Sequence, residues 1–285
     1  MKTDISYLPV QKQQELTYLV QLIQDTAPAE MIILFGSYAR NDWVEDKYDE
    51  EHFRYQSDMD ILVVVETKSE TTQSKYQLDI KHTIRQDETL KTPVSIIVHD
   101  IEFFNRRLRK GQYFFSDIKK EGIFLYNSGN YQLDEAKELL PLERRNLAFE
   151  DFEYYFKEAD EFKEIVDFCL SKNRLNKAAF LLHQTAERLY AVILLVFTRY
   201  KPNTHNLEIL RKLAYSVSNE LAPVFPLSTD ENRWLFDLLV KAYVDARYKP
   251  SYKITKNELE QLIKHVEYLR NVAHSICEKK IESFV

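Results

Sequence analysis

The sequence predicts an α+β protein in which a small mixed-sheet domain is followed by an all-helical bundle. Short apolar runs typical of strands alternate with amphipathic helical patterns up to about residue 126. From residue 134 onward, apolar residues recur at helical spacing, and no convincing alternation of period two appears. The segment NSGN at 127–130 lies between the two patterns, and its Gly and Asn residues favour turns. We therefore predict domains at 1–130 and 131–285.

The first domain is predicted from the order of its apolar runs. The runs MIILFG, DILVVVE, PVSIIVH and GIFLY are short and rich in branched or aromatic residues, as expected of strands. Amphipathic patterns of helical period fill most of the chain around them. Strands are therefore predicted at 31–36, 60–66, 93–99 and 122–126, and helices at 9–26, 71–88, 100–110 and 113–120.

The second domain consists of long amphipathic stretches separated by prolines. The breaks KPNT, APVFPLST and YKPSY each contain a proline, which cannot continue a helix. Ser228 or Thr229 is suited to cap the helix after the second break, and Thr255 with Glu258 forms a capping-box start for the last helix. Helices are predicted at 143–170, 174–199, 206–221, 229–247 and 255–280.

Composition limits the classes of partner and compartment. The chain has 285 residues, 45% of them hydrophobic, and its net charge of −6 argues against a long nucleic acid as a partner. Cys169 and Cys277 have no His or Cys nearby at metal-ligand spacing, so we expect core thiols in a reducing compartment. The N-terminus lacks a signal-peptide layout, and the longest apolar run, 190–197, is too short for a bilayer. We expect a soluble, cytoplasmic protein without a membrane partner.

Two aspartates at the start of the second strand point to metal chemistry. Asp58 and Asp60 are two residues apart, so a strand directs both to the same face, where they can share divalent metal ions that bridge substrate phosphates. Gly36 and Ser37 follow the first strand and open a helix. The backbone N–H groups there, with the Ser37 hydroxyl, are suited to hold terminal phosphates. The combination predicts a nucleotide site.

Residues 30 to about 126 resemble a nucleotidyltransferase domain of the DNA polymerase beta superfamily, of the minimal type called MNT. The resemblance rests on GSYAR and SDMD, which include Gly36, Ser37, Arg40, Asp58 and Asp60. It implies a nucleoside triphosphate substrate, Mg²⁺ or Mn²⁺ held by the two aspartates, and transfer of a nucleoside monophosphate to a small-molecule or protein acceptor. It also implies that Gly36, Ser37 and Arg40 bind the nucleotide.

The chain departs from that family in two places. The segment DWVEDKYDEEHFRYQ at 42–56 lengthens the connection between the turn and the acids, either as a lid or as a plain surface excursion. Ser95 stands where the family's third carboxylate is expected, and a serine cannot replace a carboxylate that activates the nucleophile. Asp100, with His99 beside it, is a candidate replacement. The alternative is that the two residues end the strand and cap the next helix.

Residues 143–280 resemble a HEPN domain, a helical bundle often found beside or fused to MNT domains. The resemblance rests on residues 178–210, with His183, Glu187 and His205 at positions where the family has similar residues. It implies self-association, so a homodimer is expected. Many HEPN proteins are ribonucleases that use an Arg, four to six intervening residues and a His.

The ribonuclease motif is not complete in this chain. Arg247 is followed by Tyr252 where the His would stand, and a tyrosine is too weak a base at neutral pH. Arg270 and His274 have only three residues between them, which favours a helix-surface contact over a catalytic pair. Three further side chains, Arg188, Arg247 and Tyr248, are candidates to hold phosphate and base on the bundle.

Two functions therefore remain open. The first is a magnesium-dependent nucleotidyltransferase, favoured by the intact Gly-Ser turn and aspartate pair. The second is a catalytically degenerate nucleotide-binding or regulatory protein of a toxin–antitoxin-like system, favoured by Ser95. A ribonuclease has the least support.

Overall fold

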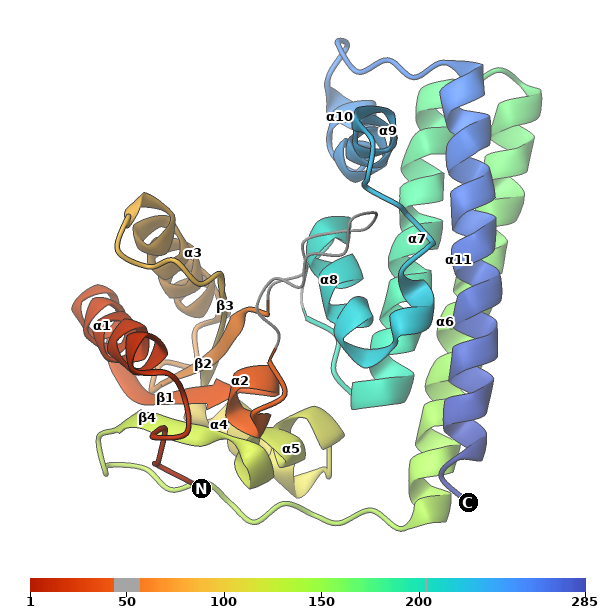
Figure 1. The fold of residues 1–285 in the computed structure, drawn as a ribbon. Helices are drawn as coiled ribbons and strands as arrows, with labels where there is room; N and C mark the ends of the chain where they lie inside the picture. The colour runs from red at the N-terminus through yellow and green to blue at the C-terminus, as the bar shows by residue number, and fades with distance from the viewer. Residues whose placement is uncertain (44–56, 203) are drawn as a thin grey trace. The chain divides into compact units, whose positions relative to one another are not determined.

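A computed structural model describes residues 1–43, 57–202 and 204–285 (Figure 1). The chain divides into two compact units, Met1–Glu138 and Leu139–Val285, each with its own hydrophobic core. The first unit contains a small mixed sheet with helices, and the second is helical. The predicted α+β fold class is confirmed.

The sheet of the first unit has four strands in the order β3-β2-β1-β4. Strand β1 (Ala29–Phe35) lies antiparallel to both β2 (Met59–Val65) and β4 (Ile123–Asn127). Strand β3 (Val94–Asp100) lies parallel to β2, so the sheet is mixed. Strands β1 and β2 are central and almost entirely apolar because both of their faces are buried.

Helices cover both faces of this sheet. The core that includes α1 (Val10–Thr26) and α3 (Glu70–Gln86) takes up alternate residues of β2, namely Met59, Ile61 and Val63. Helices α4 (Ile101–Arg109) and α5 (Tyr113–Glu121) pack on the opposite face of the sheet. Figure 1 shows these two helices across the sheet from α1 and α3. Helix α2 (Gly36–Arg40) follows β1 directly and contacts β1, β2 and α5.

The first unit extends eight residues beyond the predicted boundary at 130, because the segment 131–138 is bonded to α4 and α5. The Asn105 side chain accepts a hydrogen bond from Asp134 N at 2.8 Å. Lys137 N donates to the Leu108 carbonyl at 2.9 Å, and Lys119 Nζ donates to the Asp134 carbonyl at 2.8 Å. The turn at 127–130 thus ends β4 but does not end the unit.

The second unit is built around one apolar helix. Helix α7 (Leu175–Thr198) contacts each α-helix among the described residues of the unit, namely α6 (Pro141–Ser171), α8 (Leu207–Val217), α9 (Asp230–Lys241), α10 (Asp245–Tyr248) and α11 (Lys256–Glu282). The short 3-10 helix η1 (Asn219–Leu221) contacts α8 and α11. By length and hydropathy α7 is able to cross a membrane, but 72% of its apolar window is buried inside the unit. It is the central helix of the unit's hydrophobic core, and Cys169 and Cys277 are buried around it.

Local capping agrees with the sequence. The Thr255 hydroxyl accepts from Glu258 N at 3.2 Å, and the Glu258 carboxylate accepts from Thr255 N at 2.7 Å, which completes the capping box of α11. Thr229 caps α9 by accepting from Asn232 N at 3.2 Å. The predicted helix at 229–247 is interrupted by a turn at 242–244 and forms both α9 and α10.

Candidate functional site

The two aspartates lie at the amino end of β2. Asp58 directly precedes the strand, and Asp60 pairs with Phe35 at the end of β1 and with Ser95 near the start of β3. Met59, between them, is fully buried in the core shared with α1 and α3. Strand alternation therefore directs both carboxylates to the face on which α4 and α5 pack. Both side chains remain partly accessible.

The glycine turn packs directly against one of these carboxylates. Gly36 has φ of 72°, in the left-handed region that favours glycine. A Cβ added to it would overlap the Asp60 carboxylate oxygen Oδ2 and would lie 3.2 Å from Asp60 Cγ. Any larger residue would thus meet both backbone strain and a collision. The contact fixes the start of α2 beside the aspartate pair.

Asp60 lies in an environment that disfavours its charged form. Burial raises the pKa of the Asp60 carboxyl to about 7, although the Arg40 charge and a hydrogen bond with the Ser95 side chain act to lower this pKa. Arg40 is 45% exposed and also pairs with Asp42 at 3.0 Å and with Glu121 at 4.0 Å. A carboxyl group whose pKa is raised close to neutral pH in this way is typical of functional sites.

Ser95 and Asp100 lie at opposite ends of β3. Ser95 is beside Asp60, at the place where a third acid was expected, whereas Asp100 pairs with Val65 at the far end of β2. The two residues are five positions apart along the strand, which corresponds to about 17 Å. The Asp100 carboxylate caps α4 by accepting from Phe103 N at 2.8 Å, and it also accepts from Gln73 Nε2 at 3.1 Å. Asp100 is therefore a helix cap and does not join the aspartate pair.

His99 packs against aromatic side chains and does not lie beside the aspartate pair. Its ring stacks on Phe103 with centroids 4.1 Å apart, and burial lowers the pKa of His99 to about 4.

Most of the insertion at 42–56, which was predicted to be a lid or a surface excursion, lies outside the described residues. Within the described residues, no group of three or more His, Cys, Asp or Glu has an arrangement suited to a metal ion.

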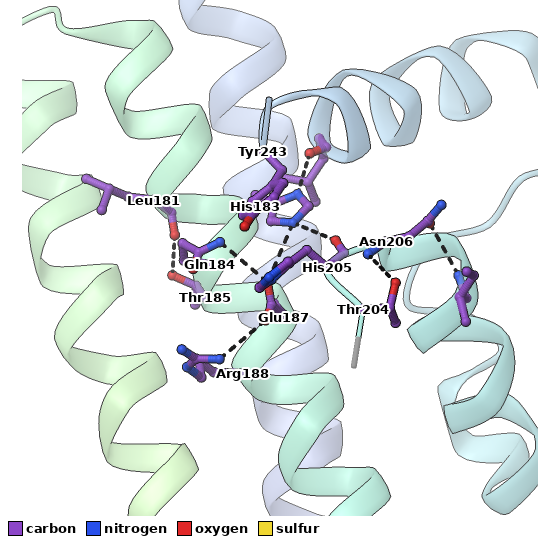
Figure 2. A network of polar contacts seen from close by, with 12 residues as sticks. Leu181, His183, Gln184, Thr185, Glu187, Arg188, Thr204, His205, Asn206 and Tyr243 are labelled. Atoms are coloured by element: carbon purple, nitrogen blue, oxygen red, sulfur yellow. Dashed lines mark hydrogen bonds and ion pairs between the residues drawn. The ribbon is translucent and has the colours of Figure 1, made fainter. Parts of the chain in front are cut away.

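A second polar cluster surrounds Glu187 inside the helical unit (Figure 2). The Glu187 carboxylate is fully buried on α7. It pairs with His205 Nδ1 at 3.0 Å, with Arg188 Nη1 at 3.3 Å and with Lys201 Nζ at 3.8 Å. His183 Nε2 lies 3.9 Å away, one helical turn earlier. Two cations, Arg188 and Lys201, thus offset the cost of burying one carboxylate.

His183 connects this cluster to helix α9 and to the segment that precedes α8. Its Nδ1 lies 2.9 Å from the Leu239 carbonyl oxygen, and its Nε2 lies 3.0 Å from the His205 carbonyl oxygen. Carbonyl oxygens only accept, so both nitrogens donate only when the ring is protonated. Burial lowers the His183 pKa, while the two carbonyls and Glu187 act in the opposite direction. The Tyr243 ring stacks on His205, with centroids 4.4 Å apart.

Comparison with known protein families identifies the helical unit. The HEPN domain family matches residues 152–276, a span that begins in α6 and ends in α11. Residues 152–276 form a HEPN domain. No curated protein matches the chain. The nucleotidyltransferase resemblance of the first unit stays a prediction.

The HEPN domain does not place a base where the ribonuclease motif requires one. Tyr252, which follows Arg247 at the position of the motif's His, is buried in the core, and its hydroxyl donates to the Leu238 carbonyl at 3.0 Å. Burial raises the pKa of Tyr252 further above its ordinary value. Tyr252 is therefore a packing residue.

The other Arg–His pair of the HEPN domain is engaged elsewhere. Arg270 forms a two-bond ion pair with Asp160 at 2.6 and 2.8 Å, which links α11 to α6. His274 pairs with Glu278 at 2.9 Å and contacts the rings of Phe152 and Phe156. Arg270 and His274 line an open groove of about 590 Å³ with these partners from α6.

The predicted phosphate and base ligands of the HEPN domain separate into two groups. Arg188 is committed to ion pairs with Glu158 at 2.8 Å and with Glu187. Arg247 and Tyr248 are exposed, and the Arg247 guanidinium lies over the ring of Tyr248 at 4.9 Å. It also lies over the Phe180 and Tyr243 rings, at 4.7 and 4.4 Å. Only this second group presents a cation and an aromatic ring to solvent.

Two contributors to these sites were not predicted. Tyr7 binds the carbonyls at the end of α2, and Lys201 reaches Glu187 from the segment after α7. Tyr7 is 31 residues from its partner Tyr38, so no local pattern indicated the contact. Lys201 is in the KPNT break, which the sequence marks only as a helix end.

Proposed function

We propose that the first unit is a magnesium-dependent nucleotidyltransferase, which transfers a nucleoside monophosphate from a nucleoside triphosphate to an acceptor and releases pyrophosphate. The observation that carries the proposal is the packing of Gly36 against Asp60, because it joins a glycine turn to an aspartate pair at one end of the central strands β1 and β2. The acceptor is a small molecule or a protein.

The residues present fit one magnesium ion. Magnesium is usually held in proteins by one or two carboxylates together with substrate phosphates and water, and Asp58 and Asp60 supply two carboxylates on the same face. Manganese suits the same oxygen ligands. When bound, the ion neutralises charge on the triphosphate and makes an attacking hydroxyl more acidic. The collision that a Cβ at Gly36 would cause with Asp60 also fits a turn at which the backbone itself meets a ligand.

The remaining residues have supporting roles in this proposal. The backbone of Gly36 and the Ser37 hydroxyl donate to phosphate oxygens, and α2, with five residues, adds only a small helix dipole. Arg40 balances negative charge near Asp60. The hydrogen bond from Ser95 orients the Asp60 carboxylate.

A second candidate function is nucleotide binding without turnover, as a regulatory protein of a toxin–antitoxin-like system. It is favoured by Ser95, which occupies the place of the third acid and cannot take a proton from an acceptor. The position of Asp100 at the far end of β3 supports the same alternative, because this carboxylate is about 17 Å from the required place. In both candidates the protein is cytoplasmic, binds a nucleoside triphosphate and forms a homodimer through its HEPN domain.

Turnover separates the two candidates. The wild type is incubated with labelled nucleoside triphosphates, magnesium and a cell extract, and pyrophosphate release and label transfer are measured. The enzyme proposal expects both signals, and the Asp58→Asn/Asp60→Asn variant serves as the inactive control.

The Ser95→Asp variant is the informative companion. A silent wild type with an active Ser95→Asp variant shows that the natural protein lacks only the third acid, which supports the binding function. If neither protein turns over and both bind nucleotide with magnesium, the enzyme proposal is wrong and the binding function stands. If neither protein binds nucleotide, both candidates are wrong.

A further inference from the structure

The short helix that carries the glycine turn is supported from the N-terminal segment. The Tyr7 hydroxyl donates to the Tyr38 carbonyl at 2.6 Å and lies 3.4 Å from the Ala39 carbonyl. These carbonyls belong to the last turn of α2, where helix carbonyls have no partner within the helix. Tyr7 thus supplies a hydrogen-bond donor to the C-terminal end of α2.

Tyr7 is itself held in place by backbone bonds on both sides. Lys2 forms a bridge with Ile123 of β4, and the Lys2 carbonyl accepts from Phe124 N at 2.9 Å. On the other side, Leu8 N donates to the Ile5 carbonyl at 3.0 Å, and the side chain of Leu8 is buried in the core. The segment before α1 therefore connects the edge strand of the sheet to α2.

Helix α2 needs such support because five residues are too few for a helix that is stable alone. At its first residue, Gly36 abuts Asp60. In its middle, Tyr38 is fully buried and stacks on Trp43 with ring centroids 5.1 Å apart. At its last turn, the bond from Tyr7 completes the support.

We infer that Tyr7 is a positioning residue for the proposed nucleotide site, because it holds α2, with Gly36, Ser37 and Arg40, in place beside Asp60. The inference rests on the proposed function. Opening of α2 moves the backbone N–H groups and the Ser37 hydroxyl away from the aspartates. Nucleotide affinity therefore depends on the fraction of molecules in which α2 is closed.

The test compares Tyr7→Phe with the wild type and with Tyr18→Phe. Tyr18 is a matched control, because its hydroxyl also donates one hydrogen bond, to Asp87 Oδ2 at 2.6 Å, but does not contact α2. Hydrogen exchange is measured at the amides of Asn41 and Asp42, which both donate to the Ser37 carbonyl. Magnesium–ATP affinity is measured on the same proteins by calorimetry.

For Tyr7→Phe we expect these two amides to exchange about three- to tenfold faster and the Kd for magnesium–ATP to rise, by no more than the same factor. For Tyr18→Phe we expect neither change. Unchanged exchange in Tyr7→Phe would overturn the inference. Faster exchange with unchanged affinity would make Tyr7 a purely structural residue, which also overturns it.

Exchange is measured without metal or nucleotide, so it does not depend on the proposed function. A wild type that binds no magnesium–ATP would contradict the proposed function, and the positioning role at a nucleotide site would then fail with it. The exchange rates would still decide whether Tyr7 supports α2.

Discussion

Gly36 and Asp60 are packed so closely that a Cβ atom added to Gly36 would overlap the Asp60 carboxylate. The two residues are 24 positions apart in the chain and are brought together because β1 and β2 pair antiparallel, with Phe35 opposite Asp60. This contact defines the candidate nucleotide site, and the first prediction tests it.

Gly36→Ala is expected to destabilise the first unit by about 2–4 kcal/mol, through left-handed strain of about 1–2 kcal/mol and through the collision with Asp60. Gly129→Ala is the matched control, because Gly129 has φ of 82° but nothing within 4 Å of an added Cβ. Urea unfolding followed by Trp43 fluorescence in a Trp234→Phe background reports the first unit alone. Equal losses in the two variants would contradict the importance of the collision.

Asp60→Asn is expected to stabilise the metal-free protein in a pH-dependent way. The folded-state pKa of Asp60 is raised from 3.8 to about 7, so the folded protein binds this proton more tightly than the unfolded chain. The wild type therefore loses stability as pH rises from about 4 to about 7, by at most about 4 kcal/mol, and Asn does not.

The measurement is the difference in unfolding free energy between Asp60→Asn and the wild type from pH 4 to pH 8, without divalent metal. We expect a difference that is smallest near pH 4 and grows in favour of the variant up to about pH 8. A difference that is constant over this range would show that Asp60 is not the group with the raised pKa.

Glu187→Gln is expected to destabilise the HEPN domain by about 2–4 kcal/mol, because the cations around this buried side chain lose their carboxylate. Glu158→Gln is the control, since Glu158 also pairs with Arg188 but is more exposed. Trp234 fluorescence in a Trp43→Phe background follows the domain. A loss no greater than that of the control would contradict the role of Glu187 as the centre of the cluster.

Tyr252→His completes the Arg–x₄–His spacing but is expected to produce no ribonuclease activity. The Tyr252 side chain is buried and hydrogen-bonded to the Leu238 carbonyl, so an imidazole at this position is inaccessible to a substrate. Cleavage of a fluorescent RNA by the variant and the wild type is the measurement. Cleavage by the variant alone would show that the position is accessible after all.

Local patterns in the sequence were sufficient to predict most of the fold. Short apolar runs predicted all four strands of the sheet, and capping residues predicted the starts of α9 and α11. Ser95 lies beside Asp60 in the register of β2 and β3, at the position where the family resemblance placed the third acid. The HEPN resemblance at 178–210 is confirmed by the match to residues 152–276.

Contacts between distant segments could not be predicted in the same way. The bond from Tyr7 to α2 and the attachment of 131–138 to α4 and α5 depend on tertiary packing, which leaves no periodic signal. Asp100 lies far from the aspartate pair because β3 is parallel to β2, so that Asp100 is beside Val65 at the opposite end of β2. Spacing along the chain does not contain that information.

The most direct test of the account is calorimetric titration of ATP into the wild type and into Asp58→Asn/Asp60→Asn, each with magnesium and with a chelator. We expect the wild type to bind ATP only when magnesium is present, and the double variant to lose this metal-dependent binding because the two carboxylates are gone. Binding of ATP by the double variant with the same magnesium dependence, or no binding by the wild type under either condition, would contradict it.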